Sequence, residues 1–137
     1  SPMVKNASYM TIKGFDGNVS PPIDAAFALD PNKVVNSSDI VLDMTVGSNA
    51  VVFTTPGVYQ FNMNPVFMGS DEKYTIKKNL VDPVFASDPP SFDSGFIRRF
   101  ILKVDTPNTK LSFVNKSATS SISPSNCSVY IEISRVV

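Results

Sequence analysis

The chain has 137 residues, of which 42% are hydrophobic, and its 12 basic and 12 acidic side chains give a formal net charge of zero. These values are typical of one globular domain with a single core, and they provide neither a basic stripe for nucleic acid nor a polybasic cluster for anionic membranes. The chain has no histidine and only one cysteine, Cys127, which excludes Ser-His-Asp and Cys-His catalytic sites, histidine-ligated zinc and a disulfide within the chain.

The whole chain, residues 1–137, is expected to form one β-sandwich domain, with residues 1–7 as a linker or tag remnant. No apolar run approaches the roughly 20 residues of a transmembrane helix, so no membrane insertion is expected.

Strand patterns start early in the chain. The run SYMTIKGF predicts a first strand, and DIVLDMTVG predicts another, with Ile40, Leu42, Met44 and Val46 on one face. The stretch between these two runs, from Gly14 to Ser38, does not fit strands. Within it, Ile23 to Asp30 is the best candidate for a short helix, because an alanine pair follows a Pro-Pro start.

The middle of the chain reads VVFTTPGVYQFNM, in which two apolar runs flank Thr-Thr-Pro-Gly. Tyr59, Phe61 and Met63 alternate with polar or smaller side chains, which predicts a half-buried strand. Pro56 fixes φ at a value that suits the second position of a turn, and Gly57 accepts a positive φ. The segment from Thr55 to Val58 therefore predicts a type II turn between two strands.

Four more runs predict strands in the second half: KYTIKKNL, GFIRRFILKVD, KLSFVN and CSVYIEISRVV. The total is about seven or eight strands separated by turn-forming residues, which favours an all-β, antiparallel, jelly-roll-like β-sandwich. The last strand is rich in valine and isoleucine, so we expect it to pair in the centre of a sheet, since an exposed edge would promote aggregation.

Two resemblances bear on function. The succession of Phe53, Pro56, Gly57, Tyr59 and Phe61, with the apolar terminal strand, resembles tumour-necrosis-factor-like and complement-type globular heads. That resemblance implies a secreted jelly-roll head that forms trimers and binds a protein receptor. The size of the chain, its low cysteine content and its many Ser, Thr, Asn and Pro residues resemble the protruding domain of a nodavirus-type capsid protein. This second resemblance implies a homo-oligomeric spike, attachment to the host and, in some members, calcium at subunit contacts.

The long stretch from Val81 to Gly95 is either a connector packed on the side of the sandwich or a contact loop. As a contact loop it would meet a receptor through Phe85, Asp88, Pro89, Pro90, Phe92 and Asp93. Asp82, Asp88 and Asp93 are either solvated carboxylates or oxygen ligands for calcium, the one cofactor considered. The loop from Asp105 to Lys110 is a second candidate for receptor contact.

Arg98 lies between Phe96 and Phe100 on an apolar face, where an unpaired guanidinium would be costly. It therefore marks a strand end, a paired charge or an oligomer contact. The two glutamates, Glu72 and Glu132, occur in unrelated segments, and Glu132 alternates outward between two isoleucines, so a catalytic carboxylate pair is not expected.

The resemblance to nodavirus-type protruding domains, with no catalytic carboxylate pair expected, implies a non-enzymatic viral capsid protruding domain at the virion surface. Such a domain would form surface spikes as a dimer or trimer and contact a host cell-surface receptor. The alternative is the secreted, extracellular trimeric head.

Overall fold

The computed structural model describes residues 8–15, 22, 24–45, 49–65, 74–79, 82–83, 99–115 and 129–136. Within these ranges the chain forms β-strands and one short 3-10 helix, η1 (Pro31–Lys33). The strands are β1 (Tyr9–Ile12), β2 (Val34–Asn36), β3 (Ile40–Asp43), β4 (Ala50–Phe53), β5 (Gly57–Pro65), β6 (Tyr74–Lys78), β7 (Asp82–Pro83), β8 (Arg99–Val104), β9 (Thr109–Asn115) and β10 (Val129–Arg135). The predicted all-β fold class is confirmed.

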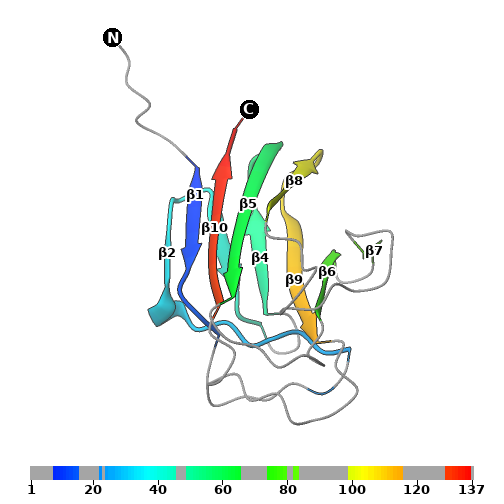
Figure 1. Ribbon diagram of the computed structural model, residues 1–137. Helices are drawn as coiled ribbons and strands as arrows, with labels where there is room; N and C mark the ends of the chain where they lie inside the picture. The colour runs from blue at the N-terminus through cyan, green and yellow to red at the C-terminus, as the bar shows by residue number, and fades with distance from the viewer. Residues whose placement is uncertain are drawn as a thin grey trace.

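The strands form two five-stranded antiparallel sheets, in the orders β2-β1-β10-β5-β8 and β3-β4-β9-β6-β7 (Figure 1). Four strand pairs are nested along the chain: β1 with β10, β4 with β9, β5 with β8, and β6 with β7. A long hairpin that wraps around itself gives this nesting, which is the strand order of a jelly roll. The two remaining strands, β2 and β3, each extend one sheet at its edge.

The predicted strands all occur, and the structure adds two short ones. β2 lies within the stretch from Gly14 to Ser38, and β7 lies within the stretch from Val81 to Gly95. Both stretches were expected to contain no strand, so that expectation is wrong for these residues. The predicted central position of the last strand is confirmed, since β10 pairs with β1 on one side and β5 on the other (Figure 1).

Side chains from both sheets meet in one core. Alternation along β5 buries Tyr59, Phe61 and Met63, as predicted, and alternation along β8 buries Leu102 and Val104. Fully burying one such side chain stabilises the fold by about 1.5–3 kcal/mol. The core cluster consists of Met10, Ile12, Phe15, Phe27, Leu29, Ile40, Val51, Phe53, Tyr59, Phe61, Met63, Ile76, Leu102, Val104, Leu111, Phe113, Ile131 and Ile133.

The strand β3 is shorter than predicted. Its pattern placed Met44 on the same face as Ile40, but the strand ends at Asp43, and Met44 is 44% exposed. The backbone N–H of Thr45 donates to Asp43 Oδ1 at 2.9 Å. An aspartate that accepts from the backbone two residues later favours a turn, and this turn ends the strand before Met44.

The helix predicted from Ile23 to Asp30 is also wrong for the residues described there. The backbone N–H of Phe27 donates to Phe113 O at 2.7 Å, and Leu29 forms a β-bridge with Phe15. The rings of Phe15 and Phe27 stack with centroids 4.8 Å apart. Burial of Phe27 and Leu29 at alternate positions therefore outweighs the helix propensity of the alanines.

The predicted type II turn at Thr55–Val58 does not form. Among the described glycines only Gly14 has a positive φ, and Gly57 already pairs with Val104 as the first residue of β5. The segment instead carries the chain from one sheet to the other. Tyr59 stabilises this crossing, because its hydroxyl donates to Thr55 O at 2.5 Å.

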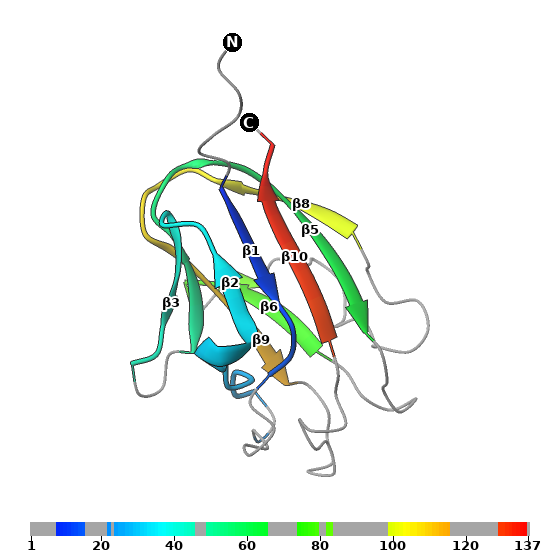
Figure 2. The ribbon, with the colours of Figure 1, turned by 90° about the vertical axis from the view of Figure 1, so that its left-hand side faces the viewer.

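The antiparallel strand order places the connections alternately at the two ends of the sandwich. At one end, near Ser8, Asp39 and Arg135, β1 begins and β10 ends (Figure 2). We call this the terminal end. At the opposite end the chain leaves β1, β3, β5, β7 and β9, and we call this the loop end.

Candidate interaction surface

The outer face of the β2-β1-β10-β5-β8 sheet is open to solvent, and we call it the interaction face. Ile101 is 56% exposed and Tyr9 is 41% exposed. Four of the six exposed large apolar side chains in the described part of the chain lie here, since Val35 and Tyr130 point the same way. Exposed apolar side chains that gather on one face indicate a contact surface.

The outer face of the other sheet, β3-β4-β9-β6-β7, is more covered than the interaction face. By alternation with core residues, Ala50, Val52, Ser112 and Val114 point away from the core, yet all four are buried. Beside them, Lys110 Nζ lies 2.7 Å from Asp43 Oδ2, so an ion pair spans β9 and β3 across β4. The two outer faces therefore have different environments, and the interaction face is the more open one.

Strand register places two opposite charges in one row across the interaction face. Glu132 of β10 is opposite Asn62 of β5, which in turn is opposite Arg99 of β8. Arg99 Nε donates to Asn62 Oδ1 at 3.0 Å. With neighbouring strands ~4.8 Å apart, the carboxylate and the guanidinium are anchored about 10 Å from each other. Both side chains are exposed, as the alternation predicted for Glu132.

The next row along the same face is uncharged. It contains Tyr9, Ser134, Gln60 and Ile101 in successive strands. Removing these side chains from water would require little desolvation of charge, so this row suits the centre of a contact.

The terminal end contains a polar cluster that the sequence did not indicate. Asp39 accepts hydrogen bonds from Ser8 and from Ser37, the latter at 2.6 Å. Burial raises the pKa of Asp39, but these two hydrogen bonds and the nearby Arg135 charge lower it, and the net pKa lies below its ordinary value of 3.8. Thr54 also bonds to the Asp39 carbonyl through both its N–H and its hydroxyl. These hydrogen bonds hold the start of β1, the start of β3 and the end of β4 together, so the cluster has a structural role.

The residues that the sequence singled out as sites lie largely outside the described ranges. This holds for Phe85, Asp88, Pro89, Pro90, Phe92, Asp93 and Arg98, and for Glu72 and Cys127. Asp82 begins β7 and pairs with Lys78, so it lies on the side of that strand that faces the terminal end. Receptor contact, calcium binding at Asp82, Asp88 and Asp93, and an oligomer contact at Arg98 stay predictions.

The other candidate loop, from Asp105 to Lys110, is described. It joins β8 to β9 and so crosses between the sheets at the terminal end. Asn108 adopts a φ of 62°, and Thr109 Oγ1 donates to Thr106 O at 2.8 Å. This compact turn lies at the terminal end, opposite the loop end.

The chain matches no protein-family model and no curated protein. Among the residues that the structure describes, no helix has the length and apolar character needed to cross a membrane. The same residues contain no group of three or more His, Cys, Asp or Glu side chains placed to hold a metal ion. Functional inference therefore depends on the fold and on the surfaces described above.

Proposed function

We propose that this chain is a non-enzymatic attachment head, the protruding domain of a viral capsid, which associates with a second copy of itself and presents its loop end to a host receptor. The interaction face carries the proposal, because large apolar side chains and two opposite charges are exposed on one open sheet. The jelly-roll order supports it, since the resemblance to capsid protruding domains implies a β-sandwich.

The charges on the interaction face are complementary to those of a second copy. Consider two copies packed face to face about a two-fold axis that runs along β5. The rotation places β10 of one copy over β8 of the other. Because Glu132 and Arg99 occupy the same row, each Glu132 then faces the partner copy's Arg99, which gives two equivalent ion pairs.

The arrangement of the ends suits attachment. Pairs or larger clusters of heads would present several loop ends together, and repeated weak contacts would add up to firm binding through avidity. Within the predicted contact loop from Val81 to Gly95, β7 runs toward the loop end, and the next strand, β8, begins at that end.

Charge reversal tests the proposed association. Glu132→Arg and Arg99→Glu should each convert the dimer to a monomer in light scattering or sedimentation, because like charges then face each other across the contact. Mixing the two variants should restore a dimer, since every facing pair is again of opposite sign. Lys13→Glu, a charge reversal at an exposed position outside the row, is the matched control and should leave the dimer intact.

Two results would overturn the proposal. One is a wild-type protein that stays monomeric across the accessible concentration range. The other is a mixture of the two variants that stays monomeric although each is folded by circular dichroism.

A second candidate, the secreted trimeric head, is favoured by a specific packing observation. Phe53, Tyr59 and Phe61 carry the resemblance to tumour-necrosis-factor-like heads, and they form one aromatic cluster. The Phe53 ring centroid lies 4.6 Å from that of Tyr59 and 6.1 Å from that of Phe61. A solution mass of three copies would favour this candidate over the two-fold arrangement.

A further inference from the structure

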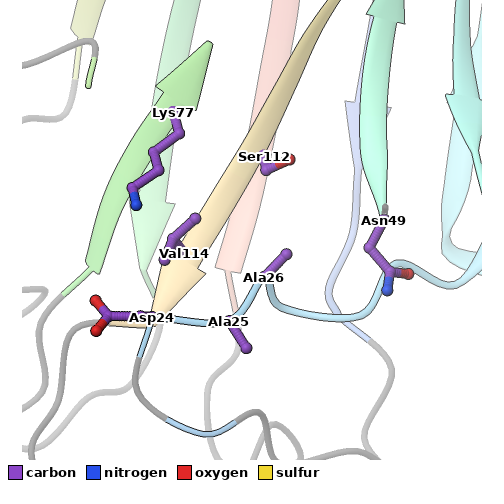
Figure 3. Close-up of a pocket in the computed structure, with 7 residues that line it drawn as sticks. All are labelled: Asp24, Ala25, Ala26, Asn49, Lys77, Ser112 and Val114. Carbon is purple, nitrogen blue, oxygen red and sulfur yellow. The ribbon is translucent and has the colours of Figure 1, made fainter. Parts of the chain in front are cut away.

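A pocket opens on the outer side of β6 and β9, toward the loop end (Figure 3). Its volume is about 290 Å³. Lys77 contributes from β6, and Ser112 and Val114 contribute from β9. The segment through Asp24 and Ala26 forms the lower border, and Asn49 stands at the start of β4 (Figure 3). Ala26 is held in place by a β-bridge to Val114.

The floor of the pocket contains an unsatisfied polar group. Ser112 is 0% exposed, and its Oγ is the one buried side-chain polar atom without a hydrogen-bond partner in the described part of the chain. Alternation explains its direction, because Leu111 and Phe113 point into the core and Ser112 therefore points outward, into the pocket. Buried polar groups are normally paired, so this hydroxyl indicates a missing partner.

The other polar groups define what that partner would be. Lys77 lines the pocket beside Ser112, to which it is directly opposite in the sheet, and its ammonium has no partner among the described residues. Asn49 Oδ1 accepts from Leu29 N at 3.3 Å, which leaves its amide nitrogen as a donor. Three donors therefore line one pocket, and they favour a ligand with an anionic oxygen group, above all a carboxylate.

The remaining border suits a ligand that is also hydroxylated. Asp24 is exposed at the rim and provides carboxylate oxygens, which accept hydrogen bonds from hydroxyl groups. Ala26 and Val114 provide a small apolar wall. The volume is close to the lower end of the ~300–1,000 Å³ range of small-molecule sites, so it accommodates one ring-sized molecule and not a chain of them.

We infer that this pocket binds an acidic monosaccharide: a carboxylated, hydroxylated ring whose carboxylate meets Ser112 and Lys77 and whose hydroxyls meet Asp24. The inference does not depend on the proposed dimer, because the pocket and the interaction face belong to different sheets. Through this pocket, the loop end would bind acidic sugars on a surface that carries glycans.

Titration with matched ligands tests the inference. Glucuronic acid and N-acetylneuraminic acid would each be compared with its own methyl ester by ligand-observed NMR and calorimetry. We expect saturable binding of at least one acid and binding about tenfold or more weaker for its ester, because the ester lacks the charge that Lys77 would meet.

Variants assign the binding to this pocket. Ser112→Ala and Lys77→Met should each weaken binding of the acid by about tenfold or more, since each removes one charge-assisted contact. Ser38→Ala and Lys13→Met, at exposed positions away from the pocket, should bind as the wild type does. A thermal melt of each variant would confirm folding.

Three results would overturn the inference: no saturable binding of either acid, equal binding of acid and ester, or binding unchanged in both Ser112→Ala and Lys77→Met. None of these results bears on the dimer, whose test is the solution mass.

Discussion

The Ser112 hydroxyl makes a clear prediction about stability. A buried hydroxyl without a hydrogen-bond partner destabilises a fold by about 1–3 kcal/mol relative to its exposure in the unfolded chain. Ser112→Ala removes this unpaired group and leaves only a small void, which reduces the gain. We therefore expect the variant to be more stable than the wild type, by about 1 kcal/mol, whereas most substitutions at buried positions destabilise.

Chemical and thermal unfolding measure this gain. For a domain of this size, about 1 kcal/mol corresponds to a rise in Tm of roughly 3 °C, and the urea midpoint should rise with an unchanged m-value. Ser38→Ala, at an exposed position, should change stability by no more than about 0.5 kcal/mol.

A loss of stability of about 1 kcal/mol or more in Ser112→Ala would refute the reasoning. It would mean that the hydroxyl is satisfied in solution, and the main argument for a missing ligand group would then fail. A variant that gains stability and loses ligand would instead show that the hydroxyl is kept for binding at the expense of the fold.

Three further predictions concern the fold. The pKa of Asp39 is lowered in the folded state, so its stabilising contribution is present above the unfolded value of 3.8 and is lost as pH falls through the folded pKa; Asp39→Asn should therefore lower the urea midpoint at neutral pH and have a smaller effect near about pH 3. Burial raises the pKa of Tyr59 above its ordinary value of 10.0, so Tyr59→Phe should remove a late-ionising component from an absorbance titration and destabilise the fold by about 1 kcal/mol through loss of the hydrogen bond to Thr55. Phe27→Ala should destabilise the fold by about 3–5 kcal/mol in urea unfolding, because it empties the stack with Phe15, and a loss below about 1 kcal/mol would contradict the packing described.

The sequence predicts most strands because their signal is local. Along β5, β8 and β10, every second position carries a large apolar side chain, and this period identifies both the strand and its buried face. β2 has only three residues and lies at a sheet edge, so its alternation is too short to stand out. The local pattern around Phe27 predicts a helix. The backbone hydrogen bond that instead holds Phe27 in an extended segment joins it to Phe113, far along the chain, so no local pattern indicates it.

The surfaces depend still more on distant segments. Alternation identifies Arg99, Asn62 and Glu132 as outward residues, but their common row follows from the register of three strands. Ser112 reads as an ordinary outward polar residue within KLSFVN. Its burial and the pocket above it require Ala26 to lie beside β9, and no local pattern specifies that contact.

The central position of β10 has a consequence for biosynthesis. Because β10, the last strand of this sandwich in chain order, separates β1 from β5, neither of those strands gains its central neighbour until β10 has been synthesised. Until then two strand edges stay unpaired, and pairing between strands that are far apart in the sequence makes folding slow. A stop codon before Val129 would leave both edges permanently open, so such a truncated product should precipitate or be degraded instead of persisting as a smaller β-sandwich.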